Sequence, residues 1–358
     1  MVKKATIFMK FVNGQVSRGY CVNRITLTNR EVIAKRNALF SEEQERQAAL
    51  VRRVEKIRVK YTGIPKECTM VMNKSISTPA DCLRHLPERM LQLSVLAYVN
   101  GEPWDMSKPL EEDCELNFAH FKDFDPRKLL TVNKAFWRSC SYLLGFAIER
   151  SFKEDHRVLL HSWPAPQIKS GSFVYDAVLP LENWEPNDRE LRALGNPVRK
   201  LQPEKASFER LEVEPALAKE IFEDNPYKHS VVDSFAESTE NKKVILYRCK
   251  DHVDISRGPM IGNTGFIRDF GVASVHAFET GIGLVYRFQG IAYPSAFTMS
   301  PFALGVLRDR AKIMNTTGLP NELNRAPGDS KSESTTEAEV PDTDDENEQT
   351  TQAHKAAQ

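Results

Sequence analysis

The chain has 358 residues and is 41% hydrophobic, which is enough for two or three compact units with substantial cores. It contains no run of about 18 to 20 apolar residues, the length that a membrane-spanning helix needs, and its six cysteines form no CxxC pair of the kind found in zinc ribbons and redox motifs. Its 49 basic and 49 acidic residues cancel, so the composition disfavours strong, charge-driven nucleic-acid binding by the chain as a whole.

Opposite charges are concentrated at the two ends. Residues 1–36 carry eight Lys or Arg and one acid, a net charge of +7, whereas residues 321–358 carry ten acids and three basic residues, a net charge of −7. Residues 1–30 contain no acid and no long apolar run, which is typical of a mitochondrial presequence; a disordered basic tail is the alternative. Residues 319–358 are rich in Ser, Thr, Asp and Glu and lack aromatics, so we expect a disordered acidic tail.

A helix is predicted over residues 28–53, in an N-terminal helical extension that we place at residues 31–54. Its apolar side chains are Val32, Leu39, Phe40 and Leu50. Residues 41–44 (Ser-Glu-Glu-Gln) resemble a capping sequence that would begin a second helical part. We expect the charged face to be solvated, with a short apolar seam docked on a neighbour as the alternative.

Residues 55–123 show the pattern of a small mixed domain. Strands are predicted at residues 57–61, 68–73, 94–99 and 114–121, a turn at 63–65, and a helix start at 77–81. The first strand alternates apolar and polar side chains, and the helix start combines a hydroxyl, a proline and an acid. Asn100-Gly101 is a strong hairpin signal. The order strand, strand, helix, strand, strand predicts a β-grasp domain.

Three motifs of this region resemble the TGS domain at the front of threonyl-tRNA synthetases. They are residues 77–81 (Ser-Thr-Pro-Ala-Asp), 99–102 (Val-Asn-Gly-Glu) and 108–116 (Lys-Pro-Leu-Glu-Glu-Asp-Cys-Glu-Leu). TGS domains are binding modules without chemistry of their own, and GTPases and other proteins carry them too. The resemblance implies a TGS-like domain at residues 55–123.

Residues 130–318 are predicted to form a second domain. A long amphipathic helix is predicted at residues 131–150, because apolar side chains recur there at helical spacing. Strands or extended segments are predicted at 171–176, 244–248, 271–277 and 284–293, a helix from about residue 215 that ends at 222–227, a turn at 281–283 and a closing helix at 301–314.

Four ordered motifs of this second region resemble the editing domain that follows TGS in threonyl-tRNA synthetases and is shared with alanyl-tRNA synthetases. They are residues 138–144 (Arg-Ser-Cys-Ser-Tyr-Leu-Leu), 171–176 (Gly-Ser-Phe-Val-Tyr-Asp), 254–265 around Arg257-Gly258-Pro259, and 286–293 (Tyr-Arg-Phe-Gln-Gly-Ile-Ala-Tyr). The resemblance implies an α+β chain, in which a β-grasp domain precedes an editing-type α/β domain. Too few residues follow residue 293 for a class II catalytic domain, so aminoacylation is not expected.

The chemistry of that editing domain depends on four residues, and all four differ here. The family has two histidines four residues apart on one helix face, and a Cys and a His four apart on a loop, which are types that bind a metal or move a proton. This chain has Arg138 and Tyr142 at the helix positions and Ser256 and Met260 at the loop positions. Arg does not release its proton near neutral pH, and Met offers only a weak thioether acceptor. The resemblance therefore implies a non-enzyme with no catalytic residue, cofactor or metal.

The remaining histidines of this region do not replace the missing set. They are His156, His161, His252 and His276. None forms an HxxxH or CxxxH pair with another, so a surface or core role is expected for each. Residues 281–283 (Gly-Ile-Gly) lack the third glycine of a dinucleotide fingerprint, and turn geometry accounts for Arg257-Gly258-Pro259 without chemistry.

The whole combination resembles one family, the mitochondrial large-subunit ribosomal protein that is related to threonyl-tRNA synthetase and is number thirty-nine in that subunit's naming. Residues 72–79 (Met-Asn-Lys-Ser-Ile-Ser-Thr-Pro), 103–106 (Pro-Trp-Asp-Met) and 136–140 (Phe-Trp-Arg-Ser-Cys) also match it. The resemblance covers about residues 35–315. For Phe136, Trp137 and Tyr142 we weigh partner contacts against core packing, and expect core packing for at least two.

That family resemblance implies a structural constituent of the mitochondrial large ribosomal subunit, located in the matrix. The implied partners are large-subunit ribosomal proteins, with mitochondrial rRNA as a further candidate, and no membrane span or small-molecule substrate is implied. Two alternatives stay open. One is a freestanding deacylase that clears mischarged tRNA, and the other is an RNA-binding regulator outside the ribosome.

Overall fold

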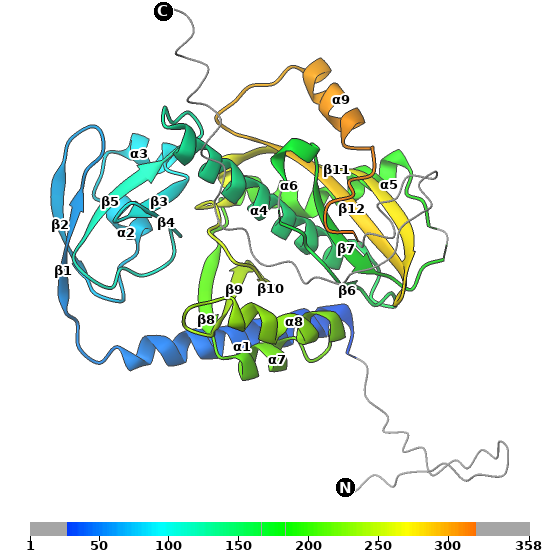
Figure 1. The fold of residues 1–358 in the computed structure, drawn as a ribbon, viewed down its shortest axis with the longest axis horizontal. Helices are drawn as coiled ribbons and strands as arrows, with labels where there is room; N and C mark the ends of the chain where they lie inside the picture. The colour runs from blue at the N-terminus through cyan, green and yellow to red at the C-terminus, as the bar shows by residue number, and fades with distance from the viewer. Residues whose placement is uncertain (1–26, 166, 183, 320–358) are drawn as a thin grey trace, which may run out of the picture. The chain divides into compact units, whose positions relative to one another are not determined.

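The computed structural model describes residues 27–165, 167–182 and 184–319, which form three β-sheets with helices packed around them (Figure 1). The chain is therefore a mixed α and β protein, in agreement with the predicted class at this coarse level. The predicted presequence (1–30) and acidic tail (319–358) lie almost entirely outside the described residues. Within those residues, no helix combines the length and apolar character that crossing a bilayer requires.

The first helix, α1 (Asn29–Leu50), is continuous. Thr28 caps it: its hydroxyl accepts from the Glu31 amide, and the Glu31 carboxylate accepts from the Thr28 amide at 2.8 Å, which forms a capping box. The prediction that residues 41–44 begin a second helical part is wrong. Instead the Ser41 hydroxyl accepts from Arg248 at 2.6 Å, so this segment serves a contact with the sheet beneath the helix.

The first sheet has the strand order β2-β1-β5-β3-β4, with β1 and β5 parallel and the other neighbours antiparallel. Its elements are β1 (Lys56–Tyr61), β2 (Cys68–Asn73), α2 (Pro79–Leu83), α3 (Glu88–Leu93), β3 (Leu96–Val99), β4 (Glu102–Trp104) and β5 (Cys114–Ala119). The four predicted strands are confirmed, and β4 and α3 are additional. Thr78 and Asp81 form the predicted cap of α2. Asn100 and Gly101 join β3 to β4 with φ of 51° and 90°, the positive values that a type I′ turn requires.

The second sheet has the order β11-β12-β7-β6. Its strands are β6 (Leu159–Leu160), β7 (Phe173–Val178), β11 (Ile267–Thr280) and β12 (Gly283–Pro294), and the long helix α4 (Pro126–Ser151) and the shorter helices α5 (Asp188–Leu194) and α6 (Asn196–Glu204) pack against it. Since side chains alternate along a strand, Phe288 joins the core with α4 while Arg287 and Gln289 face the other side. There Gln289 donates to the Ala311 carbonyl at 2.7 Å, which fastens the segment after α9 (Pro301–Arg310).

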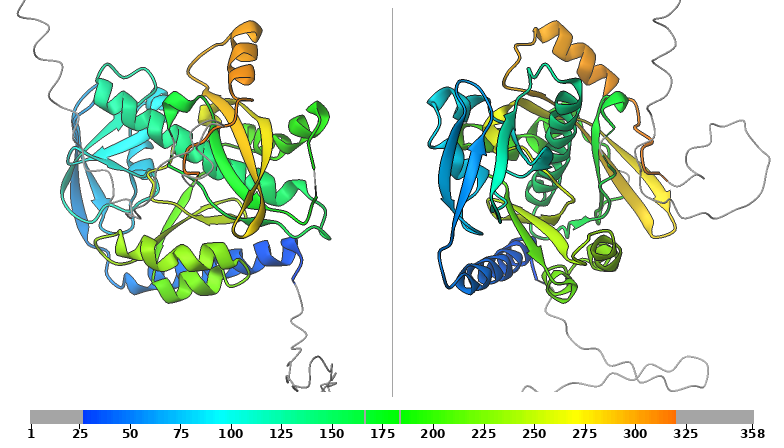
Figure 2. Two further views of the ribbon diagram at one scale, coloured as in Figure 1. Left: turned by 45° about the vertical axis from the view of Figure 1, so that its right-hand side comes forward. Right: turned by 60° about the vertical axis from the view of Figure 1, so that its left-hand side comes forward.

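The third sheet has the order β10-β9-β8 and lies next to the helices α1, α7 and α8 (Figures 1 and 2). Its elements are β8 (Glu209–Val213), α7 (Pro215–Ile221), α8 (Pro226–Glu237), β9 (Val244–Cys249) and β10 (His252–Ile255). Phe40 of α1 is fully buried in the core of this layer. The apolar side chains Val32 and Phe40 of α1 are therefore used inside the chain, whereas Leu50 is exposed. The segment 222–227 ends α7, as predicted, but Asn225 also caps α8, which was not predicted.

The first sheet is joined to the rest of the chain by a shared core. Val95, Leu96 and Phe121 belong to the same buried cluster as α4 and the second sheet. Polar contacts reinforce this junction: the Gly262 amide donates to the Val95 carbonyl at 2.9 Å, and the Ser107 hydroxyl donates to the Phe208 carbonyl at 2.8 Å. The start of β3 is thereby placed against the loop that follows β10, and the β4–β5 connection is placed against the segment before β8.

Candidate functional site

Arg138 and Tyr142 lie one turn apart on α4, and both point toward the β9–β10 hairpin and the loop that follows it. The Arg138 guanidinium donates to the Pro259 carbonyl at 3.0 Å. The Tyr142 hydroxyl lies 2.9 Å from the Tyr247 carbonyl and 2.7 Å from the His252 carbonyl. The structure thus brings the two helix positions to the segment that holds Ser256 and Met260, and each helix side chain is used to bind backbone oxygen.

Burial shifts the pKa of both helix side chains. Burial raises the pKa of the Tyr142 phenol well above its ordinary value, so this hydroxyl stays neutral. Burial lowers the pKa of Arg138, an effect that the nearby Tyr247 and Asp105 oppose. Ser256 and Met260 are only 4% and 1% exposed, so a substrate does not reach their side chains in this conformation.

Met260 is held from two directions. The Ser139 hydroxyl of α4 lies 3.4 Å from the Met260 sulfur and accepts from the Ile261 amide at 3.0 Å. The Met260 amide donates to an Asp105 carboxylate oxygen at 2.8 Å. The loop that carries Met260 is therefore packed into the interior of this chain.

Asp105, which directly follows β4 of the first sheet, binds both the Met260 loop and strand β9 through its carboxylate. Besides the Met260 amide, it accepts from the Tyr247 hydroxyl at 2.6 Å, and the Arg210 guanidinium lies 3.4 Å away. Burial raises its pKa, while Arg210 and the hydrogen bond from Tyr247 act in the opposite direction. The sequence placed Asp105 in the Pro-Trp-Asp-Met motif at 103–106, but it gave no signal that this carboxylate reaches residues more than 100 positions away.

Gly258 has a structural explanation. Its φ is +66°, in the left-handed region that favours glycine, and a Cβ there would clash with the Tyr247 hydroxyl that binds Asp105. The motif Arg257-Gly258-Pro259 therefore follows from turn geometry and close packing, as expected from the sequence. Core packing is also confirmed for Phe136 and Tyr142, which are 2% and 4% exposed.

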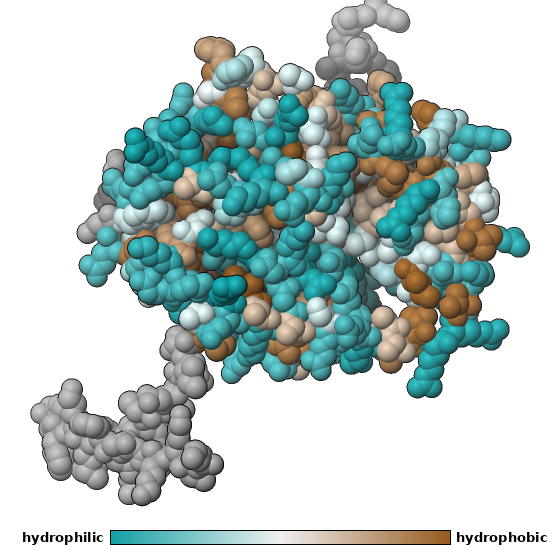
Figure 3. All heavy atoms as spheres, turned by 180° about the vertical axis from the view of Figure 1, so that it is seen from behind, coloured by the Kyte–Doolittle hydropathy of each residue, from teal (hydrophilic) through white to brown (hydrophobic). Residues whose placement is uncertain are grey.

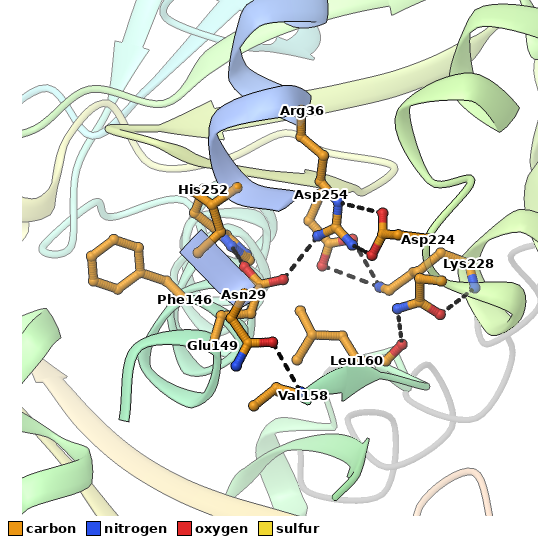
Figure 4. Close-up of polar contacts among 12 residues, drawn as sticks. Asn29, Arg36, Phe146, Glu149, Val158, Leu160, Asp224, Lys228, His252 and Asp254 are labelled. Carbon is orange, nitrogen blue, oxygen red and sulfur yellow. Dashed lines mark hydrogen bonds and ion pairs between the residues drawn. The ribbon is translucent and has the colours of Figure 1, made fainter. Parts of the chain in front are cut away.

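A buried charge cluster joins α1 to α4, the connection between α7 and α8, and β10 (Figure 4). Arg36 extends from α1 between two carboxylates, with nitrogen–oxygen distances of 2.8 Å to Glu149 and 2.7 Å to Asp224. The second Glu149 oxygen lies 2.6 Å from His252 Nδ1. Burial acts to raise the pKa of Glu149, but His252 and Arg36 outweigh it and hold that pKa at about 2. Sequence reasoning missed this cluster, because its members are far apart in the chain.

A second buried pair lies beside the first. The Lys228 ammonium is 2.8 Å from an Asp254 oxygen and 2.6 Å from the Tyr175 hydroxyl, and Tyr175 also donates to Asp254. Burial lowers the pKa of Lys228 to about 8. The Trp163 ring covers the ammonium, with its centroid 3.0 Å from the nitrogen, and stacks on Phe235. These charged groups are packed over by aromatic rings and are not open to a substrate.

The histidines do not form a metal site among the described residues. His252 is bound to Glu149, His161 lies against the Tyr227 ring, and His276 lies 3.1 Å from the Ser274 hydroxyl. Across residues 27–165, 167–182 and 184–319, no three His, Cys, Asp or Glu side chains gather closely enough to hold a metal ion.

Comparison with known proteins gives two kinds of relative. The large ribosomal subunit protein mL39 of Drosophila melanogaster is 46% identical over 293 residues, which cover 81% of this chain and 87% of the fly protein. The probable cytoplasmic threonine–tRNA ligase 1 of Dictyostelium discoideum is 31% identical over 234 residues, which cover 64% of this chain but 30% of the ligase.

The human cytoplasmic threonine–tRNA ligase 2 shows the same partial match. It is 30% identical over 222 residues, which cover 61% of this chain and 25% of the ligase. No protein-family model matches the chain. The similarity to the ligases thus spans only a quarter to a third of their length, whereas the similarity to the fly protein spans most of both chains.

Proposed function

Because the chain belongs to the family of the large ribosomal subunit protein mL39, we propose that it is a structural constituent of the large subunit of the mitochondrial ribosome and supports translation in the mitochondrial matrix. The observation that carries this proposal is the 46% identity to the fly protein over 81% of this chain and 87% of that protein. The proposed partners are large-subunit ribosomal proteins, with rRNA as a further contact.

The domain organisation belongs to the same proposal. Residues 55–123 form a TGS-like β-grasp domain, supported by the mixed five-stranded sheet with its parallel β1–β5 pair. Residues 130–318 form an editing-type domain, supported by the similarity to threonine–tRNA ligases. Residues 1–30 are a presequence, residues 31–54 a helical extension and residues 319–358 an acidic tail.

The proposal includes the absence of editing chemistry. Arg138, Tyr142, Ser256 and Met260 stand where the editing domain has its two histidines, its cysteine and its loop histidine. Two observations support loss of that activity: Tyr142 and Arg138 bind backbone carbonyls, and Asp105 fastens the Met260 loop from the first sheet. A region filled in this way favours a role in assembly.

Exposed apolar surface supports protein partners. Helix α9 contains no buried residue among its ten positions, and Phe302 and Val306, four residues apart, are 83% and 53% exposed. Hydrophobic residues are visible on the α9 side and on the side where β1 and β2 lie, within a mostly hydrophilic surface (Figure 3). Apolar side chains arranged on one helix face are typical of contacts between proteins.

The free edge of β2 supports the same conclusion. On β1, the Arg58 amide donates to Asp113 beside β5 and so points away from β2. Arg58 and Val71, which face each other across β1 and β2, are therefore a non-hydrogen-bonded pair of the antiparallel ladder. The Val71 amide and carbonyl therefore point away from the sheet, and Val71 is 64% exposed. An apolar edge of this kind can accept an added strand.

Gradient sedimentation tests the proposed function. Lysed mitochondria from cells that express the full chain are separated on a sucrose gradient, before and after a moderate potassium chloride wash. We expect the chain to migrate with the large subunit and to stay there after the wash, while a soluble matrix enzyme remains at the top. Release by the wash would favour an RNA-binding regulator held by phosphate contacts, which weaken steeply with salt.

A deacylation assay tests the absence of editing chemistry. The purified chain is incubated with mischarged threonine tRNA, and an active threonyl-tRNA synthetase serves as the positive control. We expect no hydrolysis above the spontaneous rate. Hydrolysis that depends on the chain would overturn the non-catalytic interpretation and favour the freestanding deacylase.

A further inference from the structure

A cavity of about 770 Å³ lies between the end of α4 and the helices α5 and α6, and neither Arg138, Tyr142, Ser256 nor Met260 is among its lining residues. Its volume is within the range of cavities that hold small organic ligands. Aromatic and basic side chains contribute to its wall, among them Phe152, Trp184, Lys153 and Lys200. The proposed function does not explain this combination.

The aromatic part of the wall is held in place by the core. Phe152 and Trp184 are half-buried, with ring centroids 5.4 Å apart and an interplanar angle of 77°. Trp184 also packs against Tyr286 at 5.8 Å and Phe288 at 6.2 Å, both on β12. Within the described part of the chain, the indole N–H of Trp184 donates to no other group. A fixed aromatic surface with a free donor is therefore available to a ligand.

Among the described residues of the wall, unpaired basic side chains outnumber unpaired acidic ones. Of its two acids, Glu190 accepts from the Asn187 amide at 2.9 Å and Glu204 pairs with Lys250 at 2.7 Å. Arg150 pairs with Asp251. Lys153 and Lys200 are exposed, and neither has an ion-pair partner among the described residues. Both ammonium groups are free to bind anionic groups at the rim.

We propose that this cavity binds nucleotides of single-stranded RNA, with a base against Phe152 and Trp184 and flanking phosphates at Lys153 and Lys200. Stacking on aromatic side chains and phosphate contacts from lysines are the two interactions that single-stranded nucleic-acid sites combine. This inference rests on the proposed ribosomal function, in which it supplies an rRNA contact. It is compatible with the neutral net charge, because the basic groups act locally.

The binding test uses the full purified chain and a fluorescein-labelled oligouridylate of twelve nucleotides, measured by fluorescence anisotropy at several salt concentrations. The variant Lys153→Gln/Lys200→Gln should weaken binding at least about tenfold. It should also reduce the slope of log K against log salt by about 1.4, since each phosphate contact on a single strand contributes about 0.7. The control Lys66→Gln/Lys134→Gln removes the same charge at exposed lysines outside the cavity and should change neither quantity.

A second variant separates stacking from charge. Trp184→Leu should weaken binding about 5-fold or more and leave the salt slope unchanged, because base stacking is largely independent of salt.

A competition experiment identifies the kind of ligand that the cavity binds. Uridine monophosphate and an acidic peptide with one tyrosine serve as competitors. Competition by the mononucleotide at similar concentration would assign the cavity to free nucleotides, and preferential competition by the peptide would assign it to a protein ligand; both results overturn the RNA proposal.

Failure of this RNA-binding inference can be distinguished from failure of the proposed ribosomal function. Unchanged oligouridylate binding by both cavity variants would overturn the inference even if the chain migrates with the large subunit. If instead the chain does not migrate with that subunit, the ribosomal function fails, and RNA binding at the cavity is then decided by the anisotropy data alone.

Discussion

Asp105 Oδ2 lies 2.6 Å from the Tyr247 hydroxyl, and this hydrogen bond joins the first sheet to the third. The same carboxylate accepts from the Met260 amide. The contact therefore holds together the β4–β5 connection, strand β9 and the loop that follows β10.

Removing this carboxylate should destabilise the protein strongly. Asp105→Ala leaves the Tyr247 hydroxyl and the Met260 amide buried without their acceptor, and it leaves Arg210 with Glu212 as its remaining ion-pair partner. We therefore expect a loss of about 3 kcal/mol in the free energy of unfolding. Urea denaturation followed by circular dichroism measures it. The matched control is Asp233→Ala, because Asp233 pairs with Lys219 in an exposed ion pair that should contribute no more than about 1 kcal/mol. Equal effects of the two variants would contradict the role assigned to Asp105.

The Tyr142 hydroxyl has a stabilising role of its own. Tyr142→Phe keeps the ring but leaves the carbonyls of Tyr247 and His252 without this donor, so we expect a loss of about 1–2 kcal/mol. Tyr227→Phe is the control, since the Tyr227 hydroxyl forms no hydrogen bond with other described residues. A hydroxyl that could be removed from position 142 at no cost would indicate an open, solvated pocket there.

Placing the four editing residues of the proposed correspondence in this chain should not produce the editing reaction. The variant Arg138→His/Tyr142→His/Ser256→Cys/Met260→His places the side chains of the resembling family in a region where Ser256 and Met260 are almost fully buried. We expect deacylation of mischarged threonine tRNA to stay at the spontaneous rate in a variant that circular dichroism shows to be folded. Chain-dependent hydrolysis would show that only the side chains, and not access to the site, had been lost.

Arg36 should fix α1 to the body of the chain. Arg36→Met leaves Asp224 without its cation and Glu149 with His252 as its remaining partner in a buried setting. We therefore expect a loss of about 3–5 kcal/mol and faster hydrogen exchange in α1. The neighbouring Lys35 pairs with Glu223 in an exposed ion pair, so Lys35→Met should cost no more than about 1 kcal/mol. Unaltered exchange in α1 of the Arg36 variant would contradict this anchoring.

The same cluster predicts that the free energy of unfolding depends on pH in the acid range. The pKa of Glu149 is lowered from 4.5 to about 2 in the folded chain, so its carboxylate stabilises the fold above pH 4.5. That contribution, on the order of 3 kcal/mol, should be lost as the pH falls from about 4.5 to about 2. Urea denaturation at a series of pH values measures it, and the Glu149→Gln variant should lack this part of the pH dependence. Identical pH profiles for the two proteins would refute the assignment.

Much of the fold could be predicted because its signals are local. The alternation in β1, the cap at Thr78 and the Asn100-Gly101 turn each depend on neighbouring residues, and each is confirmed. The capping sequence predicted at residues 41–44 is wrong, because a tertiary contact to Arg248 uses Ser41. Strands β8 and β10 and helices α5 and α6 were not predicted, since they are short.

The site was harder to predict, because it depends on long-range contacts. The motif match located Arg138, Tyr142, Ser256 and Met260, but it gave no information on what surrounds them. Asp105 reaches Met260 across 155 positions, and Arg36 reaches Asp224 across 188. Buried charges such as these have no periodic signature in a sequence. Only the folded chain shows that their partners compensate them.

Cross-linking mass spectrometry of intact mitochondrial large subunits tests the ribosomal assignment most directly. Lysines on the exposed surface of this chain should cross-link reproducibly to other large-subunit proteins, and these links should persist after a moderate salt wash. The contradicting result would be that this chain is cross-linked only within itself, while other large-subunit proteins in the same sample are cross-linked to one another.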